Sequence, residues 1–269
     1  MIRIGCQTYS WEMLGKKWDG RVDDILVAVA GAGYEGIEIT QTMIREYAPR
    51  PAEFAKALQE HGLVLAAFAY GSPLGFTDPD NRQRELSGAD EALRFVAGFP
   101  GTPLMLGGPT TPRRENLFEK IAHAADFFNE VGRRGRGFGV EVAFHPHSHH
   151  GSILESREEY ERIMELTDPA LISWNPDTGH IVRGGQSLAE TLQRFAARIR
   201  QIHLKDVDSE KRWQPLGQGV CDIPAILQFL TKELKFSGWI IAEEESAQAA
   251  MDPVGAVKGN RQYLQSIGY

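Results

Sequence analysis

Short apolar runs and longer amphipathic stretches alternate from one end of this 269-residue chain to the other. The apolar runs predict strands at 2–8, 33–39, 63–71, 102–108, 137–147, 170–177, 199–206 and 238–245. Stretches with helical periodicity follow them, at 23–33, 51–62, 81–101, 114–135, 156–168, 187–198, 222–234 and 253–268. Strands that alternate with helices are parallel strands joined by helical crossovers. Eight such units in a chain of this length predict an α/β fold, a closed (β/α)8 TIM barrel.

A doubly wound open sheet is the alternative architecture. It needs fewer strands and usually carries a glycine-rich dinucleotide turn after its first strand. The segment GCQTYSW that ends the first predicted strand is not such a turn. We see no linker, charge block or low-complexity segment that would divide the chain, so we expect a single domain over 1–269.

Charge and apolar content exclude several classes of partner. The net charge of −7 argues against nucleic-acid binding through a broad basic surface. No apolar run reaches the roughly 18 residues of a membrane helix, so no membrane is expected. The first ten residues contain Arg3 and no signal-peptide core, which leads us to expect a cytoplasmic protein. Cys6 and Cys221 form no CxxC pair, so a disulfide framework is not expected.

Ionisable side chains gather at the ends of the last four predicted strands. Six of the eight histidines lie between positions 145 and 203. Barrel enzymes carry their chemistry at the C-terminal ends of strands. Here these ends read His145-Pro-His147, Asn-Pro-Asp177-Thr-Gly-His180, His203-Leu-Lys205-Asp206 and Glu243-Glu-Glu245. His149 and His150, which follow the first of these motifs, are expected to be loop residues.

Side chains alternate along a strand, so each of these ends can turn one ligand toward a common point. The resulting set is His145, Asp177, His203 and Glu243. Two imidazoles and two carboxylates suit one divalent ion, Mn²⁺, Co²⁺, Zn²⁺ or Mg²⁺. The set does not choose among them, although Mn²⁺ is our first expectation. The alternatives are hydrogen-bonded rim histidines, an Asx-type turn at Asp177 and a solvated acidic loop at 243–245.

Several motifs between 139 and 245 resemble the xylose-isomerase-like barrel superfamily of sugar isomerases, epimerases and dehydratases. They are GVEVAFHPH (139–147), DTGH (177–180), HLKD (203–206), LGQG (216–219) and GWIIAEE (238–244). The resemblance implies a metal held by an acidic residue on strand five, Asp177, His203 and Glu243. His145 stands where the usual glutamate would be, which is similar to the inosose dehydratase branch. Gln218 also departs from the usual glutamate.

The resemblance implies proton abstraction α to the metal-held carbonyl of a keto-sugar or keto-cyclitol. Glu243 would be the base, and His180 or His147 the acid. Lys205 would stabilise an oxyanion or assist the acid, or else form a salt bridge. We expect an isomerase or epimerase. The alternative is an inosose-type dehydratase, a lyase, because His145 puts symmetrical two-glutamate exchange in doubt. An abasic-site endonuclease and a metal-binding non-enzyme are remote alternatives.

Four further residues are candidates for contact with a small-molecule substrate. Glu38 would bond a substrate hydroxyl, or else form an ion pair. Trp11 would form an apolar wall against a sugar ring, or else pack at the rim of the barrel. His147 lies beside the proposed ligand His145, and Arg183 follows DTGH, where a solvated loop position is the alternative. The segments 71–81 and 107–114 are expected to be loops on the substrate side of the barrel. The substrate is expected to be an unphosphorylated polyol. The resemblance also implies a possible homo-oligomer.

Overall fold

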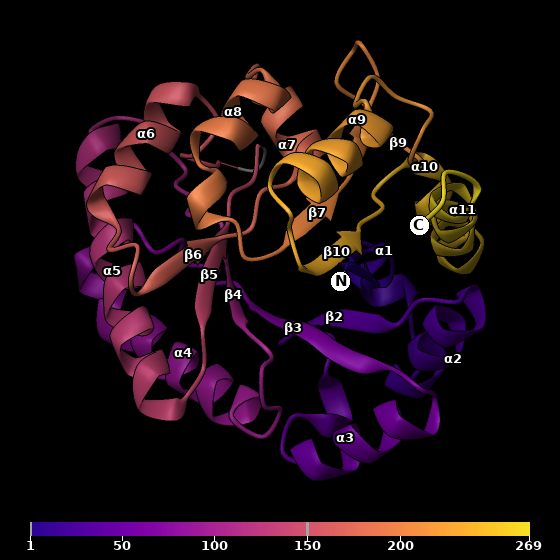
Figure 1. Ribbon diagram of the computed structural model, residues 1–269. Coiled ribbons are helices and arrows are strands. Elements are labelled where there is room, and N and C mark those ends of the chain that lie inside the picture. The colour runs from indigo at the N-terminus through magenta and orange to yellow at the C-terminus, as the bar shows by residue number, and fades with distance from the viewer. Residues whose placement is uncertain (1, 149–150) are drawn as a thin grey trace. The chain divides into compact units, whose positions relative to one another are not determined.

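The computed structural model describes residues 2–148 and 151–269, so His149 and His150 lie outside the described residues. Its elements fall into two compact units, a first unit of residues 1–67 and 201–269 and a second unit of residues 68–200 (Figure 1). The division falls inside strand β3 (Val64–Tyr70), between Ala67 and Phe68. The single domain expected from the sequence stays a prediction.

Four parallel strands form the sheet of the first unit, in the order β2-β1-β10-β7. Helix α2 packs against β2, and α11 packs beside α2 (Figure 1). A short antiparallel hairpin, β8 and β9, follows β7. The strands are β1 (Ile2–Gln7), β2 (Gly36–Thr40), β7 (Ile202–Leu204), β8 (Asp206–Val207), β9 (Trp213–Gln214) and β10 (Gly238–Ala242). The helices are α1 (Tyr9–Glu12), α2 (Val22–Ala32), α3 (Pro51–Glu60), α9 (Ile223–Gln228), α10 (Ala247–Met251) and α11 (Pro253–Ser266), with a π-helical turn at Phe229–Glu233.

The second unit repeats the same plan. The end of β3 pairs with β4, β4 with β5 and β5 with β6, all in parallel. Helix α4 packs on β4, and α5 packs on β5 and against α6 (Figure 1). The strands are β4 (Leu104–Gly107), β5 (Val142–His145) and β6 (Ile172–Trp174). The helices are α4 (Arg82–Val96), α5 (Leu117–Phe138), α6 (Arg157–Leu166), α7 (Thr178–Arg183) and α8 (Leu188–Arg194).

The loops after β3, β4 and β5 are joined by backbone hydrogen bonds. The Thr110 N–H donates to the Gly75 carbonyl at 3.0 Å, and the Thr111 N–H donates to the Gly151 carbonyl at 2.8 Å. Both glycines have positive φ, and a Cβ on either would overlap a threonine carbonyl oxygen of the 107–114 loop. Glycine therefore permits both the conformation and the close approach. The predicted loops 71–81 and 107–114 are thus held together rather than independent.

All sixteen predicted strands and helices are present, with shifts of a few residues at their ends. One of the larger shifts is at the predicted strand 137–147. Helix α5 continues to Phe138 and ends at Gly139, whose φ of 70° is the left-handed conformation of a C-cap, so β5 begins only at Val142. Helices α1, α7 and α10 and the β8–β9 hairpin are not predicted, because they are too short to show a hydrophobic period.

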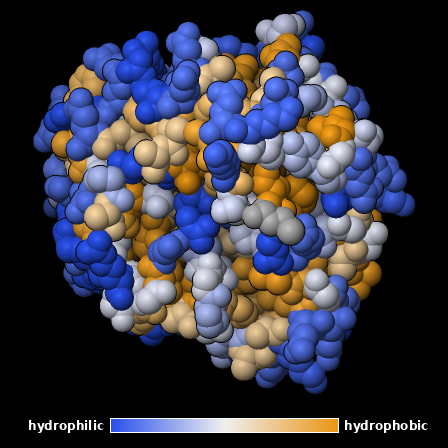
Figure 2. Space-filling model, viewed as in Figure 1, coloured by the Kyte–Doolittle hydropathy of each residue, from blue (hydrophilic) through white to orange (hydrophobic). Residues whose placement is uncertain are grey.

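Polar side chains cover much of one face of the molecule (Figure 2). Figure 2 shows hydrophilic groups over much of the viewed face, with apolar groups in smaller patches between them. Cys6 and Cys221 are both buried, and neither forms a disulfide within the described residues. Among residues 2–148 and 151–269, no helix combines the length and apolar character that crossing a membrane would require.

The N-terminus of α6 allows a direct test of local stability. The Ser156 hydroxyl accepts the Glu159 N–H, and the Glu159 carboxylate accepts the Ser156 N–H at 2.8 Å, which is a reciprocal capping box. We expect Ser156→Ala to lower the free energy of unfolding by about 1 kcal/mol. Ser187→Ala is the matched control, because Ser187 begins α8 without a side-chain capping bond. Equal effects of the two substitutions in chemical denaturation would contradict the assignment.

Candidate metal and catalytic site

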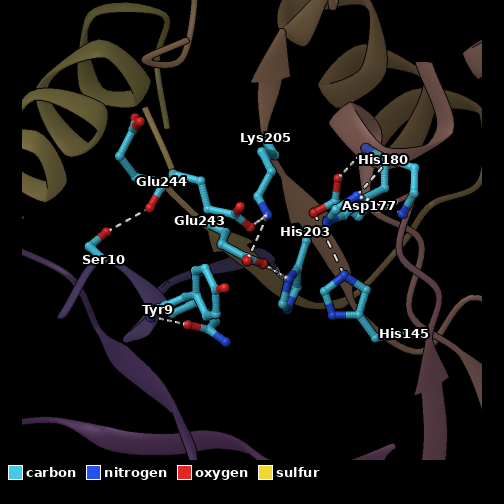
Figure 3. Close-up of polar contacts among 12 residues, drawn as sticks. Tyr9, Ser10, His145, Asp177, His180, His203, Lys205, Glu243 and Glu244 are labelled. Carbon is cyan, nitrogen blue, oxygen red and sulfur yellow. Dashed lines mark hydrogen bonds and ion pairs between the residues drawn. The ribbon is translucent and has the colours of Figure 1, made fainter. Parts of the chain in front are cut away.

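In the first unit, three buried ionisable side chains meet, one from within β2, one from within β7 and one from the residue that follows β10. The imidazole of His203 lies between two carboxylates, with Nδ1 2.6 Å from Glu243 Oε2 and Nε2 3.0 Å from Glu38 Oε2 (Figure 3 draws the first pair). Glu38 and His203 are fully buried, and Glu243 is 4% exposed. The predicted ligands His203 and Glu243 therefore contact each other directly.

Two carboxylates determine the protonation of His203. Burial alone would lower the pKa of His203, but the attraction of Glu38 and the hydrogen bonds to Glu243 and Glu38 outweigh it and raise the pKa to about 10. The ring is thus an imidazolium in the metal-free protein. A histidine ligates metal only through a deprotonated nitrogen, so metal binding at His203 would release a proton.

Lys205 holds the second oxygen of Glu243. Its Nζ lies 2.7 Å from Glu243 Oε1, it also pairs with Glu245, and it sits 4.6 Å from the centre of the Trp213 ring (Figure 3 shows Lys205 beside Glu243). Lys205 is only 1% exposed. The salt-bridge alternative considered for Lys205 is therefore present, and the bound ammonium orients the carboxylate of the proposed base, Glu243.

Glu38 and Trp11 lie deeper than substrate contacts would. Glu38 accepts hydrogen bonds from Gln201 and His203, which matches the ion-pair alternative for this residue. Trp11 is 3% exposed in α1, which matches the packing alternative.

The sequence analysis did not select Tyr9, two residues before Trp11, as a candidate site residue. It is half-buried, and burial together with Glu245 raises its pKa to about 12, so its hydroxyl keeps its proton.

Asp206 explains the LGQG motif. Its carboxylate accepts backbone N–H groups from Val207, Gly217, Gly219 and Cys221, at 2.9–3.0 Å. Asp206 is fully buried, so these four donors replace the water it gives up on folding. The segment 216–221 is thereby tied to the residue that follows Lys205. The HLKD motif shows that an aspartate follows Lys205, but nothing in the sequence indicates which backbone N–H groups donate to its carboxylate.

In the second unit, His145 and Asp177 face each other at the ends of β5 and β6. His145 Nε2 lies 3.7 Å from Asp177 Oδ2, and both side chains are buried (Figure 3). Metal–ligand bonds of about 2.0–2.2 Å place neighbouring ligand atoms roughly 3–3.5 Å apart. The pair is thus too far apart for a hydrogen bond and close to the spacing that one ion requires. The other oxygen of Asp177 caps α7 by accepting the His180 N–H at 2.7 Å, as an Asx turn would.

The tautomer of His180 follows from one hydrogen bond. The Ser148 backbone N–H donates to His180 Nδ1 at 3.0 Å, and a backbone N–H can only donate. Nδ1 therefore holds a lone pair, and the proton of the neutral ring is on Nε2. The rings of His145, His147 and His180 offer nitrogens within 4.8 Å of one another, an arrangement able to hold a metal ion. With its proton on Nε2, however, His180 serves better as a proton donor there than as a ligand.

His147 and Arg183 occupy more accessible positions than the buried groups. His147 is half-buried, with its ring centre 5.1 Å from that of His180. Arg183 is half-buried in the last turn of α7. Their accessibility is compatible with the substrate-contact role predicted for each, which stays a prediction. Together, the two units carry buried histidine, aspartate and glutamate side chains whose chemistry suits a divalent metal site.

Known proteins resemble this chain over nearly its whole length. An inosose dehydratase from Geobacillus kaustophilus is 28% identical across 99% of this chain and 94% of its own. The structure of 3-keto-D-glucoside 4-epimerase from E. coli matches with a TM-score of 0.78 and 18% identity, over 99% of this chain and all of its own. The structure of the IOLI protein with a bound zinc atom gives 0.81 and 18%, over 98% and 97%.

A family model described as "Xylose isomerase-like TIM barrel" matches residues 26–267. The match spans almost all of the predicted strand and helix units, and the solved structures share the fold with which it is named. These findings confirm the predicted fold class, a (β/α)8 TIM barrel with parallel strands. They also confirm the resemblance seen in the DTGH and HLKD motifs. The chain belongs to the xylose isomerase-like TIM barrel family.

Proposed function

We propose that the protein is a metal-dependent dehydratase that removes water from a keto-inositol or a closely related keto-cyclitol. The sequence analysis favoured an isomerase or epimerase and kept the dehydratase as its alternative. The full-length similarity to inosose dehydratases supports that alternative better. His145 supports it too, because it removes the glutamate needed for symmetrical exchange of a proton between two carboxylates.

We propose that His145, Asp177, His203 and Glu243 together hold one divalent ion. The short separations within each pair support this, as does a barrel fold in which the C-terminal ends of all strands lie on one face. When bound, such an ion would act as a Lewis acid toward a substrate carbonyl. Mn²⁺ remains our first expectation among Mn²⁺, Co²⁺, Zn²⁺ and Mg²⁺. The bound zinc of the IOLI protein is compatible with this range.

The tautomer of His180 is the observation that carries the proposed reaction. Elimination needs one base and one acid of different kinds. We assign the base to the Glu243 carboxylate, which takes the proton from the carbon α to the carbonyl. As the carbon–carbon double bond forms, the β-hydroxyl departs and His180 donates its Nε2 proton to the leaving oxygen, so that water leaves. The proton that Glu243 took then restores Nε2–H, so both residues return to their starting protonation states. Lys205 keeps Glu243 oriented throughout, through the contact at Oε1.

The remaining predicted site residues fall into two groups, one half-buried and one buried. We keep His147 and Arg183 as proposed substrate contacts. The burial of Trp11 and Glu38 favours packing and ion-pair roles for those two residues. The cytoplasmic location, the unphosphorylated substrate and the possible homo-oligomer stay predictions.

A keto-sugar epimerase is the second candidate, and one observation favours it. The half-buried His147 ring lies beside His180, so a second proton-transfer group is available for returning a proton to carbon. Epimerisation retains every hydroxyl, whereas dehydration loses one. The two candidates therefore differ in their products.

Proton NMR in D₂O tests the proposal. We expect 2-keto-inositol, incubated with the Mn²⁺-treated protein, to lose water and yield an enone or dione, whereas ketohexoses and ketopentoses stay unchanged. Deuterium at the α-carbon with an epimer or aldose as product would instead establish the second candidate. Metal binding without any turnover would contradict both and leave the binding-protein alternative. The same mixture without added metal, after treatment with a chelator, should be inactive.

A further inference from the structure

We propose that Glu38 is a positioning residue that fixes the tautomer of His203 and strengthens it as a metal ligand. The inference rests on the metal site proposed above and assigns a new task to a residue outside the ligand set. It is carried by a single juxtaposition in the first unit, where the Glu38 carboxylate faces the nitrogen of His203 that lies away from Glu243.

The geometry leaves His203 one way to bind metal. Its Nδ1 faces Glu243, another proposed ligand, at 2.6 Å, and its Nε2 faces Glu38 at 3.0 Å. Neutral imidazole carries one proton. With the acceptor Glu38 at Nε2, that proton stays on Nε2, and the lone pair of Nδ1 points to the Glu243 side. Histidine ligands usually donate their second N–H to such an acceptor, which orients the ring and raises its basicity.

The position of Glu38 is itself held by a neighbour. Gln201 donates its amide N–H to Glu38 Oε2, the same oxygen that faces His203, and both residues are fully buried. The backbone of Glu38 is also anchored, because its carbonyl accepts the Thr8 N–H at 3.1 Å. Carboxylate, amide and strand thus form a rigid support behind the imidazole.

Stability alone is a poor reason for a carboxylate at this place. A fully buried carboxylate is unfavourable unless charge and hydrogen bonds compensate for its lost hydration. Glu38 Oε1 has no hydrogen-bond partner among the described residues, so compensation comes through Oε2 alone. An apolar side chain would fill the same space without this penalty. The arrangement serves His203 rather than the packing of the core.

Cobalt binding to the full-length protein tests the inference. Purified metal-free wild type, Glu38→Ala and Glu38→Gln are titrated with Co²⁺, with the Kd measured by calorimetry and the coordination followed by visible absorption. We expect Glu38→Ala to raise the Kd by about 10- to 100-fold and to shift the cobalt bands. Glu38→Gln keeps a neutral acceptor for Nε2–H, so we expect it to restore part of the affinity and most of the wild-type spectrum.

Glu85→Gln is the matched control. Glu85 is a glutamate of the second unit, 2% exposed, whose carboxylate accepts the Phe76 N–H. We expect its Kd for Co²⁺ to stay within twofold of wild type. Wild-type spectra and affinities in both Glu38 variants would overturn the positioning role while leaving the proposed metal site intact. Failure of the wild type to bind Co²⁺ would overturn the metal site and the inference together. If Glu38→Ala does not fold, Glu38→Gln with an unchanged Kd and spectrum still overturns the role.

Discussion

Replacement of Glu243 by glutamine is expected to reduce the rate of water elimination by about 10²–10⁴-fold, the usual contribution of a positioned general base. An amide cannot accept the α-proton, and it is a poorer metal ligand than a carboxylate. The fold should survive, because the partners of Glu243 keep other contacts. His203 still faces Glu38, and Lys205 still pairs with Glu245.

Glu245→Gln is the control for Glu243→Gln. Glu245 pairs with the same ammonium of Lys205, whereas Glu243 pairs with Lys205 and also contacts His203. We expect Glu245→Gln to change the rate by less than about tenfold, because Lys205 keeps its pair with Glu243 and the proposed base itself is unchanged. Metal content of both variants must be measured alongside the rate. Metal-loaded Glu243→Gln with wild-type turnover would contradict the assignment of the base.

Deuterium exchange separates the base from the acid. In D₂O, Glu243→Gln should abolish exchange at the α-carbon, since no group removes the proton. His180→Gln should still permit exchange while elimination falls, because the proton on Nε2 is needed only when the hydroxyl leaves. Proton NMR of the recovered substrate measures the first effect, and product formation measures the second. Loss of exchange in both variants would show that His180 is required for proton removal itself.

The hydrophobic period and the alternation of side chains along strands predict where the ionisable groups lie. They do not predict which residues these groups contact. Strand ends follow from the hydrophobic pattern, so His145, Asp177, His203 and Glu243 could be selected without coordinates. Their partners could not. The sequence contains no sign that Ser148 meets His180, because that contact depends on the backbone direction of a loop. A residue such as Glu38 can be assigned to a substrate or to a histidine only when its depth is known.

Short helices and tight turns escape prediction for a different physical reason. A helix of six residues such as α7 (Thr178–Arg183) spans fewer than two turns, too few for a period of 3.6 to appear. It forms because Asp177 caps its first turn, a single local contact. The DTGH motif is therefore at once a helix start and part of the candidate site, and the sequence alone cannot separate the two roles.

Substitution of Gly219 by alanine is expected to lower the free energy of unfolding by about 3 kcal/mol, combining overpacking with the loss of hydrogen bonds to a buried carboxylate. A Cβ at this position would overlap both Asp206 Oδ1 and the Val207 carbonyl oxygen. The Gly219 N–H also donates to Asp206 at 2.9 Å, so the backbone cannot retreat without breaking that bond. This is why the LGQG motif carries glycine at its last position.

Gly31→Ala is the counterpart of Gly219→Ala. Gly31 lies within α2, where a Cβ would meet nothing within 4 Å, so we expect a gain of about 0.5–1 kcal/mol from improved helix propensity. Chemical denaturation measures both variants.

Hydrogen exchange should show that the loss of stability in Gly219→Ala is localised to residues 206–221. Because Asp206 follows Lys205, we expect turnover of this variant to fall as well. A Gly219→Ala protein as stable as wild type would mean that the segment 216–221 can move away from Asp206, and the buried carboxylate would then not be what anchors it.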